Sequence, residues 1–248
     1  MKAIILKTTL VTALTVGMAE SALAHANFIP KDNLDMYSGR DYKEGSSAFL
    51  SLNLSHGCSN ADGETFATKH AVAIMPNDQS LAGIAFTKDR MGNRYGANGV
   101  MSVRPEADAN WKRIEAPKAT VGEYYSHGLK TEDIAAIQWK RGNIPANFYA
   151  SVNFRVALPY LESCVSKIKV QIPTVQYCTS GYIKAWIKEP TPSMPTDVIS
   201  TGYAPYFNIV RADNNPLGDE CGGVGTEEEV YPSTDQIENN LISRRGMR

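Results

Sequence analysis

The sequence predicts an all-β protein, an antiparallel β-sandwich of about seven to nine strands. Five runs of residues show the period-two pattern of strands in a folded sheet. Turn-forming clusters separate these runs, and no capped amphipathic stretch of helical length competes with them. Short strands with turn signals between them are typical of sandwiches of the immunoglobulin or fibronectin type.

The expected strands lie, in chain order, at residues 49–54, 71–74, 152–156, 167–172 and 182–187. The turn clusters between and after them lie at residues 57–63, 88–99, 140–145 and 188–195. In the last run, Trp186 shares one face of the strand with Tyr182 and Lys184. The opposite face carries Ala185 and Ile187, which are residues of core type. The pattern therefore predicts that Trp186 points away from the core.

Composition limits the classes of function. The chain has 248 residues, 43% of them apolar and 21% charged, so it can bury one substantial core. Its 25 basic and 26 acidic residues give a formal net charge of -1. Nucleic-acid binding is not expected, because phosphate neutralisation needs an excess of basic residues. No membrane span is expected either, since no stretch of the mature chain approaches roughly 20 consecutive apolar residues.

The N-terminus has the organisation of a secretory signal. Lys2 and Lys7 form a basic start, and residues 8–18 are mostly apolar. Ser21-Ala22-Leu23-Ala24 then ends in the small-x-small pattern that signal peptidase accepts. We therefore expect removal of residues 1–24 and export to the periplasm or the cell surface.

Two further segments follow the signal. Residues 25–212 contain all the predicted strands and are expected to form the sandwich. Residues 213–248 are polar, with Gly222-Gly223 and Glu227-Glu228-Glu229 among them. This composition predicts a mobile C-terminal tail.

The four cysteines are Cys58, Cys164, Cys178 and Cys221. An even number of cysteines in an exported protein indicates two disulfides. Four cysteines allow three connectivities, and their spacing does not choose among them. A thiolate metal site is the alternative, but the chain has no CxxC pair to favour it.

His25 becomes the first residue if cleavage follows Ala24. An amino-terminal histidine offers two nitrogens, the α-amine and its own Nδ1, which can close a chelate ring on one ion. Divalent copper stands at the top of the affinity order for nitrogen sites and favours nitrogen and oxygen ligands in a tetragonal arrangement. Because the amine must lose a proton to bind, the affinity for copper should rise with pH.

The mature chain resembles the YcnI-like family of secreted copper-binding domains, over roughly residues 25–210. The resemblance rests on ordered pieces: His25-Ala26-Asn27-Phe28, Glu44-Gly45-Ser46, Ser55-His56-Gly57-Cys58, Arg104-Pro105 with Trp111-Lys112, Ile134 to Trp139, Gly142-Asn143-Ile144-Pro145, and Gln176-Tyr177-Cys178 through Gly181 to Trp186. The His-Gly-Cys piece is similar to the proteobacterial branch of the family. The Asp-Glu-Phe element of the family is absent, and Phe148-Tyr149-Ala150-Ser151 stands in its place.

The resemblance implies a copper site. In it the terminal histidine, His25, chelates the ion, a carboxylate completes the ligation, and a tryptophan, here Trp186, packs near the ion. The carboxylate does not transfer cleanly, because the segment after Cys58 is longer than the family pattern and leaves Asp62 and Glu64 both open. His56 is a third candidate, since imidazole is a good copper ligand.

The resemblance also implies a disulfide pairing. In the family, the cysteines at the places of Cys58 and Cys178 are bonded to each other. This pairing leaves Cys164 to bond with Cys221.

The leading hypothesis is an exported, non-catalytic protein that binds one copper ion for acquisition, storage or hand-over to another copper-handling protein. The first alternative is a copper enzyme similar to lytic polysaccharide monooxygenases, which needs a second histidine: His56, His70 or His127. The second alternative is a metal-free, disulfide-bonded structural domain. Trp111 and Trp139 are expected in the core, because large aromatic residues supply much of the buried area of a sandwich.

Overall fold

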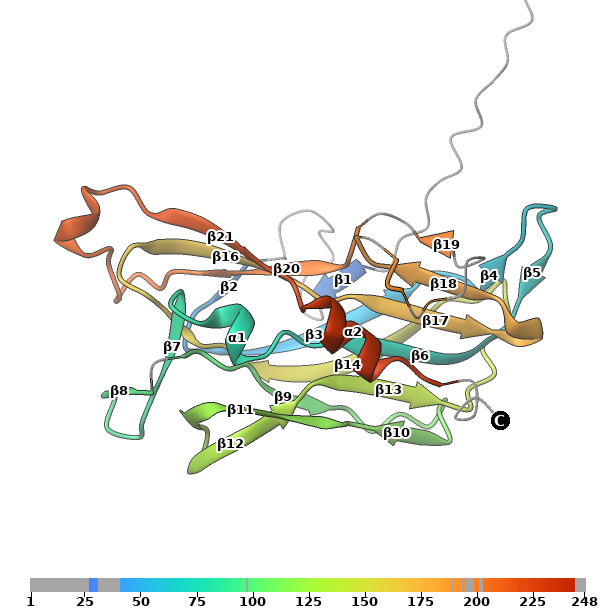
Figure 1. Ribbon diagram of the computed structural model, residues 1–248, viewed down its shortest axis with the longest axis horizontal. Helices are drawn as coiled ribbons and strands as arrows, with labels where there is room; N and C mark the ends of the chain where they lie inside the picture. The colour runs from blue at the N-terminus through green and yellow to red at the C-terminus, as the bar shows by residue number, and fades with distance from the viewer. Residues whose placement is uncertain are drawn as a thin grey trace, which may run out of the picture.

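A computed structural model of the protein describes residues 27–30, 41–96, 98–188, 190–192, 194, 199–200 and 203–243. The expected signal peptide and His25 lie outside these residues. The described chain forms an elongated sandwich of β-sheets with two short α-helices, α1 (Asp78–Leu81) and α2 (Thr234–Asn240), as Figure 1 shows. The all-β sandwich is confirmed.

One layer of the sandwich is a single antiparallel sheet. Its strand order is β1 (Asn27–Pro30), β3 (Ser47–Leu54), β14 (Ala150–Ala157) and β9 (Ser102–Pro105). Strand β14 pairs with β3 over its whole length, from Ala150 opposite Leu54 to Ala157 opposite Ser47. These two strands form the middle of the layer, and β1 continues it at one edge.

Two sheets form the opposite layer. The larger has the order β10 (Arg113–Glu115), β13 (Ala136–Lys140), β6 (Thr68–Ile74), β17 (Thr174–Cys178), β18 (Ile183–Trp186), β19 (Ile199–Ser200). The smaller has the order β2 (Asp41–Lys43), β20 (Tyr206–Val210), β16 (Val165–Gln171), β21 (Thr226–Val230). Three of their pairings are parallel, namely β2 with β20, β16 with β21, and β18 with β19.

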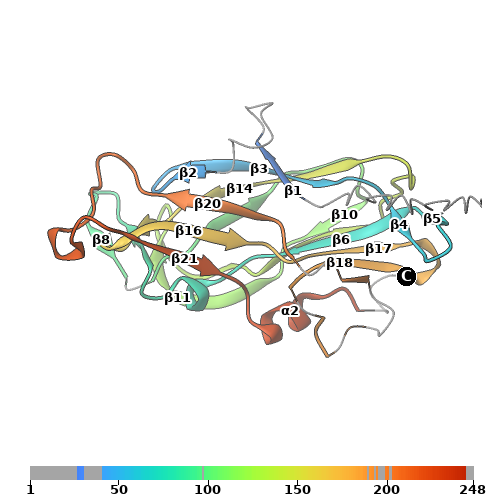
Figure 2. The same cartoon turned by 90° about the horizontal axis from the view of Figure 1, so that it is seen from above.

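Three smaller sheets lie at the ends and along one side of the sandwich. They are β4 (Cys58–Ser59) with β5 (Thr65–Phe66), β15 (Tyr160–Leu161) with β7 (Ala85–Lys88) and β8 (Arg94–Tyr95), and β11 (Lys118–Tyr125) with β12 (Leu129–Ile134). The β4–β5 hairpin and the β7–β8 hairpin occupy opposite ends of the long axis in both Figure 1 and Figure 2. The strand labels run to β21, beyond the expected seven to nine. Many of the additional strands have two to four residues, which leave no readable periodicity, but β11 and β12 are longer and were also not predicted.

The main core lies between the layers. Every second residue of β3 points into it, namely Ala48, Leu50, Leu52 and Leu54, and the three residues Val152, Phe154 and Val156 do the same from β14. All five runs predicted as strands contain one, whereas the predicted turn clusters at residues 57–63 and 88–99 also contain the short strands β4 and β8. Trp111 and Trp139 are buried in this core, as predicted.

The C-terminal segment is not a mobile tail where it is described. Residues 226–230 form β21 beside β16, and α2 packs against the outer face of the six-stranded sheet (Figure 2). Ile237 and Ile242 are buried there, and the Gln138 side chain donates a hydrogen bond to the carbonyl of Asn240 (2.9 Å). The prediction of a tail from residue 213 is wrong for these residues, because Val230 is buried in the main core and Ile237 and Ile242 are buried against the six-stranded sheet.

The same segment explains a second wrong prediction. Trp186 and Ala185 do point to opposite faces of β18, but Trp186 points into the main core and is 1% exposed. Ala185 and Ile187 lie in a second apolar cluster beneath α2. Both faces of the strand are buried, so the smaller apolar residues did not mark the main core. In the described part of the chain, no helix is long and apolar enough to cross a membrane.

Candidate metal centre

The His-Gly-Cys sequence forms the turn between β3 and β4. A Cβ atom added at Gly57 would overlap the carbonyl oxygen of Phe66 and lie 2.9 Å from the Cα of Ala146. The Gly57 amide also donates a hydrogen bond to the carbonyl of Ala146 (2.9 Å). Only glycine fits between these two segments, so His56 and Cys58 are held in fixed places on either side of it.

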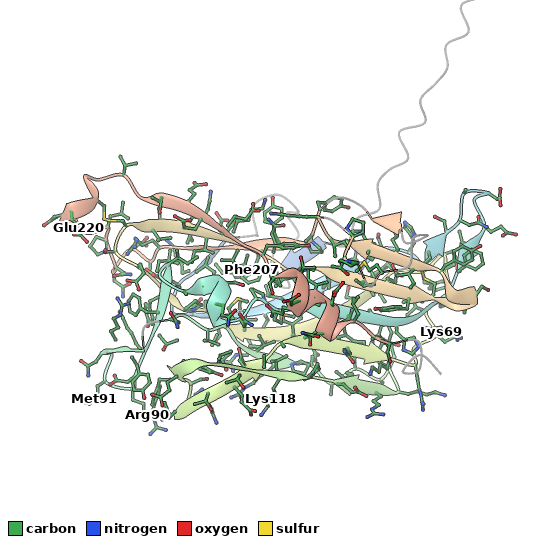
Figure 3. All side chains as sticks on the ribbon, in the orientation of Figure 1. Lys69, Arg90, Met91, Lys118, Phe207 and Glu220 are labelled. Atoms are coloured by element: carbon green, nitrogen blue, oxygen red, sulfur yellow. A yellow bond between two sulfur atoms is a disulfide. The ribbon has the colours of Figure 1, made fainter. Side chains whose placement is uncertain are left out.

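Two disulfides fasten opposite ends of the sandwich. Cys58 is bonded to Cys178 at the end of β17, and Cys164 is bonded to Cys221. Both pairings implied by the family resemblance are confirmed. The first bond lies at the β4–β5 end, and the second lies beside Glu220, which Figure 3 labels at the opposite end. Two disulfides in one chain fit a protein of an oxidising compartment.

Gln176 holds the His56 turn from inside the molecule. Its Nε2 donates hydrogen bonds to the carbonyl of His56 (2.8 Å) and to the hydroxyl of Thr68. Sequence reasoning did not select this residue for a role. The available signal was a glutamine between Val175 and Tyr177 in a strand otherwise suited to burial, since a buried amide needs partners.

The ring of His56 is half-buried, and its Nδ1 lies 2.5 Å from the carbonyl oxygen of Gly57. A carbonyl oxygen only accepts hydrogen bonds, so Nδ1 donates in this contact, and in a neutral imidazole Nε2 then keeps its lone pair. Histidines that bind metals usually donate the other ring N–H to such an acceptor. His56 therefore fits a copper ion through Nε2.

Asp62 and Glu64 lie in the exposed loop of the β4–β5 hairpin. The Asn60 side chain organises this loop, because its Oδ1 accepts the amides of Asp62 (3.1 Å) and Glu64 (2.9 Å). Its Nδ2 donates to a carboxylate oxygen of Glu64 (2.8 Å). This geometry is that of a solvated turn. The carboxylate of Glu64 already has a partner, and that of Asp62 is exposed to solvent.

His56, Asp62 and Glu64 do not form a preassembled three-ligand cluster. Among the described residues, the potential ligand atoms that lie within 4.8 Å of one another belong to Cys164, Glu220 and Cys221. The two sulfur atoms of that group are joined in a disulfide, so neither can act as a thiolate ligand. Any copper centre at the His56 end needs a ligand from another segment.

His70 and His127 have other surroundings. His70 is buried on β6, and its Nδ1 accepts the amide of Arg141 (3.3 Å), which is a structural contact. His127 is exposed in the turn between β11 and β12, and it lines a cavity together with residues of the β7–β8 hairpin. That hairpin lies at the end of the sandwich opposite β4 and β5 (Figure 1). His56 is therefore the candidate second histidine for a site near β4.

His25 lies outside the described residues, but the strand that follows it is described. In the antiparallel pairing of β1 and β3, Asn27 is opposite Asn53 and Phe28 is opposite Leu52. The N-terminal end of β1 thus lies at the end of β3 that leads into the turn with His56. Sequence reasoning did not find this proximity, because strand register is a tertiary property.

Two polar atoms at this end of β3, the Oδ1 of Asn53 and the Oγ of Ser55, are buried with no hydrogen-bond partner among the described residues. Successive residues of a strand point to opposite faces, so Asn53 points to the side opposite Leu52 and Leu54, which face the core, and Ser55 is the first residue after β3. Buried polar atoms without partners are uncommon and call for a missing partner. A bound ion or its ligands would supply one.

Trp186 is further from the turn than the resemblance implies. It pairs with Thr174, whereas Cys178, which is bonded to Cys58, stands four residues along β17. At about 3.3 Å per residue, this separation is about 13 Å along the strand. Its indole Nε1 is buried without a partner, but so are those of Trp111 and Trp139, so this feature does not distinguish Trp186.

Part of the chain matches a known protein-family model. Residues 96–200 match the model of a family described as a domain of unknown function, DUF1775. This is the YcnI-like domain. The resemblance is confirmed at that level, and the matched stretch includes Cys178 and Trp186 but none of the candidate ligands His25, His56 and Glu64.

A solved structure also aligns with the chain. It is a crystal structure of an uncharacterized protein from Nocardia farcinica, described as having an immunoglobulin-like fold. The alignment covers 68% of this chain and 91% of that protein, at 12% sequence identity and a TM-score of 0.39. A comparison with curated proteins finds no match.

Proposed function

We propose that the protein is exported and binds one copper ion through His25 once residues 1–24 are removed. The observation that carries the proposal is the register of β1 on β3. Asn27 is opposite Asn53, so the end of β1 that leads back toward His25 in the sequence lies beside the end of β3 that leads into the turn with His56. The proposed amine and ring of His25 then lie next to the turn that holds His56.

The donor set at this turn suits divalent copper. The proposed ligands are the α-amine and Nδ1 of His25 with Nε2 of His56, and an oxygen ligand completes the site. The Asp62 and Glu64 carboxylates stay candidates for that oxygen. The unpartnered oxygen of Asn53 is a further donor within the same stretch of β3. Nitrogen and oxygen ligands of this kind favour copper over softer or harder ions.

The turn is rigid enough to serve as a preformed half of the site. The disulfide from Cys58 to Cys178, the hydrogen bond from Gln176 to the His56 carbonyl, and the close packing of Gly57 all fix its backbone. A ligand whose supporting contacts are already made loses less conformational entropy on binding. The preformed turn therefore lowers the entropic cost of binding copper.

The proposed role is non-catalytic: acquisition or storage of copper, or its hand-over to another copper-handling protein outside the cytoplasm. The match to the YcnI-like domain and the two disulfides support this role. Assignment to the proteobacterial His-Gly-Cys branch is part of the same proposal. The monooxygenase alternative would rest on His56 as its second histidine, because His70 is engaged in the interior and His127 lies at the other end.

Copper titration of the mature protein and its variants tests the proposal. His25→Ala removes the ring nitrogen, and His56→Gln removes the second imidazole. Both should weaken binding by at least about tenfold, whereas His127→Gln at the opposite end should leave it unchanged. Binding to the mature protein should also tighten from pH 6 to pH 8, because the amine must be deprotonated. Unaltered affinity in His25→Ala would refute the proposal.

A further inference from the structure

A second concave site lies at the end of the sandwich opposite the His56 turn. A cavity of about 570 Å³ opens between the β7–β8 hairpin, the β11–β12 turn, residues 45–47 and residues 157–160, which lead from the end of β14 into β15. In Figure 3, Arg90 marks this end of the molecule and Lys69 lies toward the other. The volume falls within the range of small-molecule pockets, which is about 300–1,000 Å³.

The lining of the cavity is positively charged. It includes Lys88, Arg90 and Arg155, and its one described carboxylate is that of Asp89. Asp89 is engaged in its own hairpin, where Oδ1 accepts the amides of Met91 (2.8 Å) and Asn93 (2.9 Å). Within the described chain, none of the three cations forms an ion pair with a carboxylate. A concave surface with unneutralised cations attracts anions.

Two of these cations are held in place by neutral groups, so their charge is not neutralised. Nη2 of Arg155 donates a hydrogen bond to the hydroxyl of Ser47 (2.6 Å), which is a neutral partner. Nζ of Lys88 lies 4.0 Å from the centre of the Tyr160 ring, a cation–π contact. Both side chains are half-buried, so they are partly ordered before a ligand arrives. A guanidinium held in this way can present a planar pair of donors to a carboxylate or phosphate.

Tyr160 is itself fixed by the backbone. It packs over Gly45, where an added Cβ would overlap the ring, and Gly45 has a φ of 67°, in the left-handed region. The neighbouring Glu44 is buried and accepts the amides of Leu161 (2.5 Å) and Ala212 (2.9 Å). The Glu44-Gly45-Ser46 piece therefore builds a firm wall of the cavity.

Hydroxyl groups supply the rest of the polar lining. The side chains of this kind are Ser46, Ser47, Thr87, Ser102, Ser126 and the three tyrosines 124, 125 and 160. The hydroxyl of Ser126 donates to that of Ser102 (3.0 Å), so the pair still offers acceptor capacity. Hydroxyl groups donate and accept equally well, which suits a ligand that itself carries many hydroxyls.

We propose that this cavity binds an anionic sugar, with the anionic group held by Arg155 and Lys88 and the ring hydroxyls held by the serine and tyrosine hydroxyls. The volume is far larger than a bare inorganic anion needs, and the cations disfavour an apolar ligand. A carboxylated sugar and a phosphorylated sugar share the required chemistry. The site is independent of the proposed copper centre, because it lies at the other end of the fold.

Calorimetric titration with defined probes tests this inference. Galacturonate represents the carboxylated class and glucose 6-phosphate the phosphorylated class, while glucose and inorganic phosphate each carry half of the chemistry. We expect saturable binding of at least one anionic sugar at millimolar or lower concentration, at least tenfold tighter than glucose and inorganic phosphate. Binding should weaken with added salt. No saturable binding of either anionic sugar, or equal binding of inorganic phosphate, would overturn the inference.

Charge-matched variants separate the site from a general effect of charge. Arg155→Gln and Lys88→Gln should each weaken binding of the anionic sugar at least tenfold. Lys118→Gln removes the same charge from an exposed position of β11 outside the cavity and should have no effect. Lys88→Gln serves if Arg155→Gln does not fold, as judged by its thermal unfolding. Copper affinity should be the same in all these variants, so failure here leaves the copper proposal standing. Equal sugar affinity in Lys88→Gln and Lys118→Gln would contradict the assigned site.

Discussion

The two ends of the sandwich differ in how closely their loops pack. At the β4–β5 end, Gly57, Gln176 and the disulfide of Cys58 close the structure tightly around one histidine. At the β7–β8 end, the loops stand apart and leave a cavity lined by cations and hydroxyls. Loops at strand ends are free to vary while the core holds them in place. One fold can therefore present a small rigid metal ligand set and a larger polar cavity at once.

Removal of each disulfide should give the largest difference in behaviour between the two ends of the sandwich. Bonds between residues 120 and 57 positions apart close large loops, and the chain-entropy model assigns each about 4–5 kcal/mol of stability. Cys58→Ser with Cys178→Ser, and Cys164→Ser with Cys221→Ser, should each lower the free energy of unfolding by about that amount in urea titrations. Copper affinity should fall only in the first pair, because only that bond holds the His56 turn. An equal loss of copper affinity in the second pair would contradict the division between the ends.

Stability should fall with rising pH because of a carboxyl group behind the cavity. Burial raises the pKa of Asp133 to about 7, against hydrogen bonds from the backbone and Tyr124 and the charge of Lys118. Its unfolded value is near 3.8, so the folded state binds an extra proton between about pH 4 and pH 7. Ionisation should cost up to about 4 kcal/mol of the free energy of unfolding as pH rises through this range.

Asp133→Asn provides the matched comparison. Urea unfolding at pH 5 and pH 8 should show the pH-dependent loss in the unmodified protein and most of it removed in the variant. Tyr124 lines the cavity, so the variant also tests whether this buried pair supports the cavity end. The same pH slope in both proteins would assign the loss to other groups.

The C-terminal helix α2 should contribute less to the free energy of unfolding than either disulfide. Ile237 is 2% exposed in α2, and truncating a buried isoleucine to alanine typically costs about 2–5 kcal/mol. We expect Ile237→Ala to fall at the low end, about 2–3 kcal/mol, because the helix has seven residues and can relax. Val224→Ala is the control, since Val224 is 78% exposed. Equal stability of the two variants would mean that this segment is not part of the core.

The sequence predicted β3 and β14, whose side chains alternate between core and surroundings. It missed β11, which is equally long, because a register shift between Thr120 and Tyr124 breaks the alternation there. It did not predict the cover over Ala185 and Ile187, since α2 is short and its segment is rich in polar residues. Period two correctly separated the two faces of β18, but periodicity cannot tell which face meets which layer. The tail and the direction of Trp186 were therefore one error rather than two.

The two candidate sites also differ in how far the sequence predicted them. His56 was recognisable from a short motif. The disulfide of Cys58 with Cys178, 120 residues away, followed from the family resemblance, since spacing did not choose among the three connectivities. The cavity was not recognisable, since Lys88 and Arg155 come from strands far apart in sequence and meet only in the fold. The Glu44-Gly45-Ser46 piece was noticed as a motif, but its packing against Tyr160 depends on tertiary contact.

Quenching of tryptophan emission by bound copper should give the smallest effect of these tests. It reports which tryptophan of the six-stranded sheet lies nearer to the ion. Trp186 is on β18, and Trp139 is on β13, three strands away, which is about 14 Å at 4.8 Å per strand. If copper binds beside the β1 edge and near β18, Trp186→Phe should remove most of the quenching by bound copper, and Trp139→Phe should remove little. A larger loss of quenching in Trp139→Phe would place the ion on the other side of the sheet.

The most direct test of the central claim is copper affinity with and without one added residue before His25. The extension moves the α-amine away from the Nδ1 of His25 and leaves every described residue unchanged. The account predicts at least a tenfold weaker affinity for the extended protein, measured by competition with a chelator at pH 7.5, with unchanged thermal unfolding in the absence of copper. Equal affinity of the two forms would contradict copper chelation by the terminal histidine.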